Sequence, residues 1–154
     1  MAIEQELTDL VGNWKGTNRL HAPWMPEPLQ LSASTAMVRS KMNGQFLSID
    51  YTWSFEGEPQ EGMLILGCDS KSDAVQAVWT DSWHSKDVLM LCNGSRDENG
   101  RISVIGYYAV PEHPDWGWRT EITPAGAGSF RYAMYNVSPE GEEEIAVETE
   151  FEPA

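Results

Sequence analysis

The densest group of side chains that could do chemistry lies between Trp79 and His84. Alternate residues of an extended strand share a face, so Trp79, Asp81 and Trp83 would place a carboxylate between two indole rings. If that face lines a cavity, Asp81 is a polar anchor in an aromatic pocket, a common way to orient a small ligand. The alternative is an aspartate at a barrel rim that accepts hydrogen bonds from turn amides, with the tryptophans as core. The sequence leaves both interpretations open.

His84 directly follows this strand and could act as a general base. That role needs a nucleophile and an orienting partner within hydrogen-bond distance. Ser82 and Ser85 lie nearby, but the sequence around them lacks the context of a nucleophile elbow. A rim or surface histidine is the simpler interpretation. The alternative is a small enzyme that acts on a carbonyl or hydroxylated ligand through Asp81, His84 and Arg119.

Arg119 lies in a second aromatic segment, Trp116–Ile122. There Arg119 and Glu121 would share one strand face, with Trp118 on the other. If the tryptophans face inward, the two charges form a solvated pair worth under about 1 kcal/mol. If Arg119 faces inward, it could hold a carboxylate ligand through two parallel hydrogen bonds. Alternation favours the first arrangement.

Other aromatic residues could line a cavity, since the chain holds seven tryptophans and five tyrosines. Large rings can fill a barrel as packing or surround a pocket, and buried tyrosine hydroxyls need partners. The candidate ligand-binding residues are Trp53, Trp79, Asp81, Trp83, His84, Tyr107, Trp118 and Arg119. No catalytic residue is assigned. The three histidines lack zinc-ligand spacing, and the acidic run 142–144 is predicted to be a solvated strand start, so no metal site is predicted.

The elements that would position these residues are strands. In segment 47–55 the odd-numbered residues are apolar or aromatic and the even-numbered ones polar, which is typical of a half-buried antiparallel strand. Similar runs cover 13–21, 29–42, 61–68, 74–83, 87–95, 101–109, 116–123, 128–137 and 143–151. About ten short strands separated by turns predict an all-β fold. A closed up-and-down antiparallel barrel of 8–10 strands is favoured over a sandwich, because closure leaves no unpaired edges.

Two segments break the strand pattern. Ile3, Leu7 and Leu10 recur at helical spacing, which predicts a short N-terminal helix that ends before Gly12. Loop 22–28 holds three prolines with Trp24 and Met25, so it cannot pair as a central strand. We expect it to form a stiff flap with an apolar tip.

Size and charge limit the classes of function. The 154 residues fit one domain, 1–154, and the formal charge of −14 argues against nucleic acid and anionic membranes as partners. Two cysteines make no disulfide framework, and the charged N-terminus does not look like a signal peptide. The sequence therefore predicts a cytoplasmic protein, monomeric or homodimeric, with a small molecule as its partner.

Several motifs support the barrel independently. Gly12-Asn13-Trp14 after a short helix resembles the Gly-x-Trp opening of lipocalin-like barrels, in which the tryptophan plugs the narrow end. It is followed in order by Gly44-Gln45-Phe46-Leu47, Glu61-Gly62-Met63-Leu64, Leu66-Gly67-Cys68-Asp69 and Val78-Trp79-Thr80-Asp81-Ser82. Over nearly the whole chain this set resembles an uncharacterised bacterial lipocalin-like family of the calycin superfamily, known as a domain of unknown function. The resemblance implies an antiparallel barrel of eight to ten strands and no established activity.

The function that these observations favour is binding of a small, mostly apolar ligand in the barrel cavity. The enzyme that uses Asp81, His84 and Arg119 is one alternative. Another is a haem-binding barrel with His84 or His21 as axial ligand, since the sequence leaves the cofactor open. A barrel that serves as an interaction module is the last. Fold alone does not choose among them.

Overall fold

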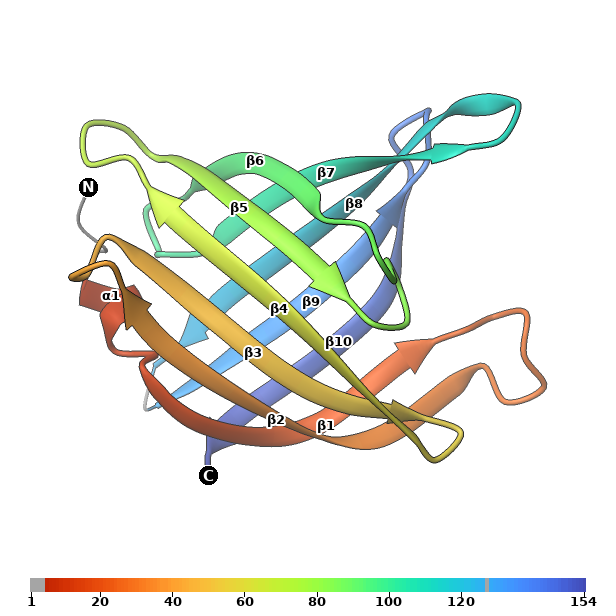
Figure 1. Cartoon of the computed structure of the whole chain (residues 1–154), viewed down its shortest axis with the longest axis horizontal. Helices are drawn as coiled ribbons and strands as arrows, with labels where there is room; N and C mark the ends of the chain where they lie inside the picture. The colour runs from red at the N-terminus through yellow and green to blue at the C-terminus, as the bar shows by residue number, and fades with distance from the viewer. Residues whose placement is uncertain (1–4, 127) are drawn as a thin grey trace.

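The computed structural model describes residues 5–126 and 128–154, whose ten antiparallel strands close into one barrel (Figure 1). Each strand pairs with its neighbours in sequence, and β1 pairs with β10 to close the circle. The elements are α1 (Gln5–Thr8), β1 (Gly12–His21), β2 (Leu29–Lys41), β3 (Phe46–Phe55), β4 (Glu58–Cys68), β5 (Ala74–Asp81), β6 (Met90–Arg96), β7 (Ile102–Val110), β8 (His113–Ala125), β9 (Ser129–Val137) and β10 (Glu143–Pro153). The predicted all-β closed barrel is confirmed.

Strand alternation sets the interior of the barrel. In β3 every second residue is buried, namely Leu47, Ile49, Tyr51 and Trp53. The polar residues between them, such as Asp50, face outward, except Ser48, which is also buried. Most strand bounds agree with prediction to within two residues, but β4 begins at residue 58 and β6 at residue 90, each three residues from its predicted start. β8 begins at residue 113 because the β7–β8 hairpin continues the pairing beyond the predicted start, and β5 ends at residue 81, where the chain turns.

One end of the barrel, here called the base, is covered by the N-terminal segment (Figure 1). Leu7 and Leu10 are buried, and Trp14 Nε1 donates a hydrogen bond to the Leu10 carbonyl at 2.7 Å. The Trp14 ring meets Phe130 edge-on, with centroids 5.0 Å apart. The predicted helix is a single turn in the described chain, and Ile3, which was expected to belong to it, lies outside the described residues.

The opposite end, here called the mouth, carries the β1–β2, β3–β4, β5–β6, β7–β8 and β9–β10 connections (Figure 1). Segment 22–28 forms the predicted flap here, between β1 and β2. The Ala22 amide donates to the Pro28 carbonyl at 2.7 Å, which closes the loop on itself. Trp24 projects from it with 72% of its surface exposed.

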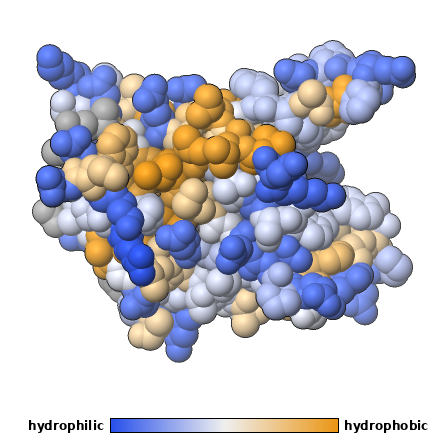
Figure 2. Space-filling model, in the orientation of Figure 1, coloured by the Kyte–Doolittle hydropathy of each residue, from blue (hydrophilic) through white to orange (hydrophobic). Residues whose placement is uncertain are grey.

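The outer surface is not uniformly polar. Figure 2 shows an apolar strip across the face formed by β4, β5 and β6. Its most exposed members are Leu91, Leu89 and Met42, and a groove of about 400 Å³ runs beside them over Ile65 and Val78. The strip arises because several outward positions of these strands are apolar, contrary to the alternation found elsewhere. Among the described residues, no helix is long and apolar enough to span a membrane.

Candidate ligand-binding cavity

A cavity of about 340 Å³ lies at the mouth, inside the ring of loops. This volume is at the small end of the range of about 300–1,000 Å³ that is usual for ligand pockets. The flap, the β5–β6 turn and strands β1, β8, β9 and β10 supply its walls. The lining residues are Leu20, His21, Pro23, Trp24, Pro28, Trp83, His84, Trp118, Asn136, Glu144, Ile145 and Ala146.

His84 is the central polar group of this cavity. Its ring stacks on Trp53 with centroids 5.4 Å apart and 25° between the planes, and it meets Trp83 at 4.8 Å and Trp118 at 5.1 Å. Burial among these rings lowers the pKa of His84 to about 4, although the Asp81 carboxylate opposes the shift. The imidazole is therefore neutral at pH 7. Within the described residues its backbone amide bonds Asp81 and its ring nitrogens make no hydrogen bond, so the neutral ring has a lone pair that can accept one from a ligand.

Asp81 places His84 in this position. Its side chain is 1% exposed, and Oδ1 accepts hydrogen bonds from the Trp83 and His84 amides at 2.8 and 3.0 Å. Oδ2 accepts from the Tyr51 hydroxyl at 2.7 Å and from Trp53 Nε1 at 3.2 Å. A carboxylate has about four acceptor sites, and all four are used here. Asp81 therefore bonds turn amides, as in the alternative interpretation of the sequence, and leaves no free acceptor for a ligand.

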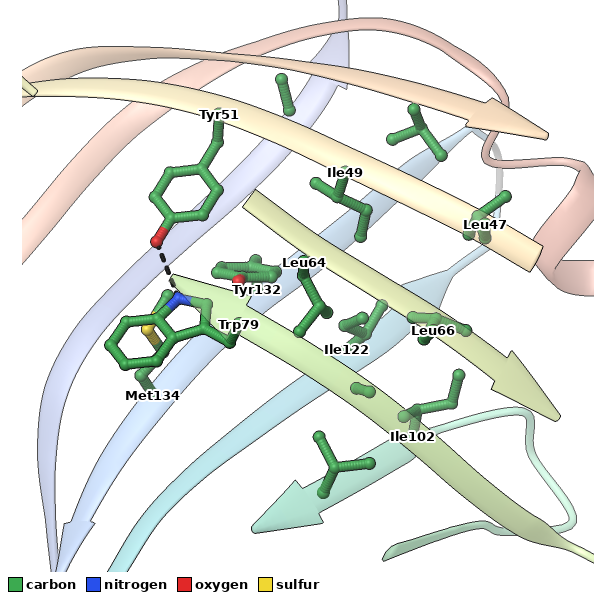
Figure 3. Close-up of a cluster of buried hydrophobic side chains, with 14 of the residues drawn as sticks. Leu47, Ile49, Tyr51, Leu64, Leu66, Trp79, Ile102, Ile122, Tyr132 and Met134 are labelled. Carbon is green, nitrogen blue, oxygen red and sulfur yellow. Dashed lines mark hydrogen bonds between the residues drawn. The ribbon is translucent and has the colours of Figure 1, made fainter. Parts of the chain in front are cut away.

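The contact between Tyr51 and Asp81 depends on a glycine. Gly62 on β4 lies between them in the sheet, and a Cβ there would come within 2.1 Å of Tyr51 Cζ. The missing side chain lets the phenol cross over β4 to β5, where its oxygen also accepts a hydrogen bond from Trp79 Nε1 at 3.0 Å (Figure 3). Burial raises the pKa of Tyr51 well above 10, so the hydroxyl stays protonated as a donor. Sequence reasoning missed Tyr51 and Gly62; the available signal was a glycine inside a strand.

Below Trp79 the barrel is filled. Leu64 and Leu66 of β4 meet Ile102 of β7 and Ile122 of β8 in Figure 3, and each is at most 1% exposed. Packing at this density leaves no room for a ligand. Any ligand in the lumen is therefore confined to the mouth, above the Trp79 layer.

A row of side chains completes the cavity on its far wall. Trp118 pairs with Asn136, which in turn pairs with Glu144, so the three lie side by side on adjacent strands. Tyr108 donates its hydroxyl hydrogen to Asn136 Oδ1, which leaves the amide nitrogen of Asn136 as its free end. Glu144 belongs to the acidic run that was expected to be solvated, and it is exposed; its place in the lining of the cavity was not predicted.

Two of the candidate site residues lie elsewhere. Arg119 is on the outer face, where its guanidinium bonds Glu121 and Glu143 at 2.7 Å and lies 4.3 Å over the Tyr135 ring. Tyr107 is on the same outer side and 62% exposed. Strand alternation turns both away from the lumen, so neither lines the mouth cavity, contrary to the expectation that they share one site with the other six residues. The structure brings together the other six, Trp53, Trp79, Asp81, Trp83, His84 and Trp118, around the mouth.

Other hollows suit a ligand less well. One of about 830 Å³ extends over the outer faces of β2 and β3, where Arg39 and Asp50 are exposed. The groove of about 400 Å³ beside Leu91 offers apolar contact and no charged side chain among its described lining. Of these three hollows in the described part of the chain, the mouth cavity is the one that combines aromatic walls with a neutral polar group whose ring makes no hydrogen bond. Within the described residues, no cluster of three or more metal-ligating side chains is found.

The fold and the cavity define a single antiparallel barrel with one aromatic-lined mouth. Residues 2–152 match the family described as "Protein of unknown function (DUF1579)", and the chain belongs to that family. Among solved structures it is similar to Rv2717c from M. tuberculosis, with a TM-score of 0.65 and 12% identity over 99% of both chains. At this identity the likeness shows the fold alone. No curated protein matches the chain.

Proposed function

We propose that this protein is a lipocalin-like (calycin) barrel that binds a small, mostly apolar molecule in its mouth cavity. The observation that carries the proposal is the His84 ring, which lines the cavity among three tryptophans and whose ring nitrogens make no hydrogen bond within the described residues. A ring nitrogen without a partner in the protein can accept a hydrogen bond from a ligand. The indole walls supply the apolar contact.

The enzymatic alternative has less support. It requires Asp81, His84 and Arg119 near one point, yet Arg119 lies outside the barrel and Asp81 already accepts four hydrogen bonds. A histidine with a pKa of about 4 is also a weak base at neutral pH. The nearby Ser85 hydroxyl bonds the Asp81 backbone and is no free nucleophile.

Haem is the second candidate, and a specific observation favours it. Iron is bound by a neutral imidazole nitrogen, which His84 offers toward the cavity, whereas His21 Nε2 is held 3.2 Å from Glu148. The cavity of about 340 Å³ is small for a macrocycle, so haem requires the flap to move outward. A Soret band on addition of hemin, lost in His84→Phe and retained in His21→Phe, is the expected result for this candidate.

Native mass spectrometry tests the binding function itself. The protein as purified, and after incubation with a set of small apolar molecules, should carry a one-to-one adduct that is lost on denaturation. Ala146 lines the cavity, so Ala146→Phe should fill it and remove the adduct. Tyr107→Phe, a change on the outer face, is the control that should retain it. An adduct that survives in Ala146→Phe would contradict a ligand site in the mouth.

A further inference from the structure

The charges around the mouth cavity are of one sign. Glu144 contributes a carboxylate, while His84 is neutral and Asn136 is an amide. No lysine or arginine is found in the described lining. His21, the remaining titratable group there, is paired with Glu148, and the whole chain carries a formal −14. An anionic ligand would meet a negative potential and no cation in this cavity.

The walls suit a positive charge. Trp24, Trp83 and Trp118 line the cavity, and the face of an indole ring attracts cations more strongly than that of any other side chain. His84 adds a lone pair, which accepts a hydrogen bond from an N–H donor.

We propose that the ligand is a small primary or secondary amine, bound as its ammonium ion, on an apolar body the size of an aromatic ring. The ammonium group lies against the indole faces near Glu144 and donates one N–H to His84, while the body fills the apolar part of the cavity. This proposal rests on the proposed binding function and names the chemical class of ligand for the same cavity.

A matched ligand series tests the class. The probes are 2-phenylethylamine, 2-phenylethanol and 3-phenylpropionate, with their naphthyl counterparts, titrated by calorimetry at pH 7 and low salt. We expect the amine to bind at least tenfold more tightly than the alcohol, and the carboxylate to show no binding. Raising the salt concentration should reduce the advantage of the amine, because exposed charges are screened.

Two matched variants localise the charge recognition. Glu144→Gln should weaken amine binding several-fold and leave alcohol binding unchanged. Glu142→Gln, two residues away in the β9–β10 turn and outside the cavity lining, should change neither. An equal loss in both variants would overturn the role of Glu144, because it would show a general effect of net charge.

The outcomes separate this proposal from the binding function. If amine and alcohol bind equally, or if the carboxylate binds best, the amine proposal is overturned, while loss of all binding in Ala146→Phe still supports the cavity. If none of the probes binds and purified protein shows no adduct in native spectra, the binding function itself fails.

Discussion

The two ends of the barrel use the same residue types for different purposes. At the base, Trp14 donates its indole hydrogen to the Leu10 carbonyl and packs edge-on against Phe130. At the mouth, Trp118 lies with its Nε1 unpartnered among the described residues, beside the unbonded ring of His84. Aromatic content alone therefore does not identify a binding site. The distinguishing feature is whether the polar edge of each ring finds a partner within the protein.

Asp81 links the mouth to the interior of the barrel. It is buried below the mouth and fixes both the interior phenol of Tyr51 and the turn that carries His84. We therefore expect substitutions at the base to change stability alone, substitutions at Asp81 to change stability and binding together, and substitutions at His84 to change binding with little effect on stability at neutral pH.

The largest effect on stability is expected at the base. Trp14→Ala removes a large buried ring and its hydrogen bond, which should lower the free energy of unfolding by about 3–5 kcal/mol. Chemical denaturation monitored by circular dichroism measures the change. Ligand affinity of the folded fraction should be unaltered. A loss below about 1 kcal/mol would show that Trp14 is not a packing element.

The next effect is expected at Asp81. Asp81→Ala leaves two backbone amides, one phenol and one indole without their acceptor, which should cost about 2–4 kcal/mol. Because the 82–85 turn loses its anchor, ligand binding should fall in parallel. Asp81→Asn keeps one acceptor oxygen and should retain part of both properties. Normal binding by a destabilised Asp81→Ala protein would separate the carboxylate from the positioning of His84.

Acidification should lower the free energy of unfolding through the protonation of His84. Its folded-state pKa of about 4 lies below the ordinary value of 6.5, so the unfolded chain binds the proton first as the pH falls. The contribution of His84 to the free energy of unfolding is fully present above about pH 6.5 and is lost as the pH falls toward 4. The total loss is at most about 3 kcal/mol. Unfolding titrations at pH 7 and pH 4 should show a larger loss for wild type than for His84→Phe. Identical losses in the two proteins would argue against a depressed pKa.

The smallest effect on stability is expected for His84→Phe at pH 7. The phenyl ring keeps the aromatic contacts with Trp53 and Trp118, so the free energy of unfolding should change by less than about 1 kcal/mol. Ligand affinity should drop several-fold because the nitrogen lone pair is gone. Calorimetric titration beside thermal unfolding measures both. Full affinity in this variant would remove His84 from the site.

Most of the fold could be predicted because strand alternation is a local property. Each period-two run identified one strand, and closure was favoured because a closed barrel leaves no unpaired edges. Alternation also indicated correctly that Arg119 faces outward. The end of β5 was placed two residues too late, since the turn depends on hydrogen bonds that the Asp81 carboxylate accepts from the Trp83 and His84 amides, which a periodic pattern does not encode.

The missed residues have specific physical causes. A β-bulge between Ile145 and Val147 shifts the register of β10 by one residue. Simple alternation counted back from Val147 would turn Glu144 outward. The bulge instead places Glu144 beside Asn136, on the cavity side. From the sequence, Tyr51 could not be distinguished from the other inward aromatic residues. Its hydrogen bond to Asp81 crosses the intervening strand at Gly62, and alternation within one strand does not show such a contact. Such contacts depend on three strands at once, and no single segment of sequence carries them.

The empty position at Gly62 also constrains how this sequence can diverge. An added methyl group would collide with the Tyr51 ring, so Gly62→Ala is harmful while the tyrosine is present. If the tyrosine is lost before the glycine, the buried Asp81 carboxylate loses a hydrogen-bond donor. Each single step is therefore disfavoured, and the order in which neighbouring positions change decides which descendants remain folded. Related chains should keep or lose the glycine, the phenol and the carboxylate together, as one inherited unit.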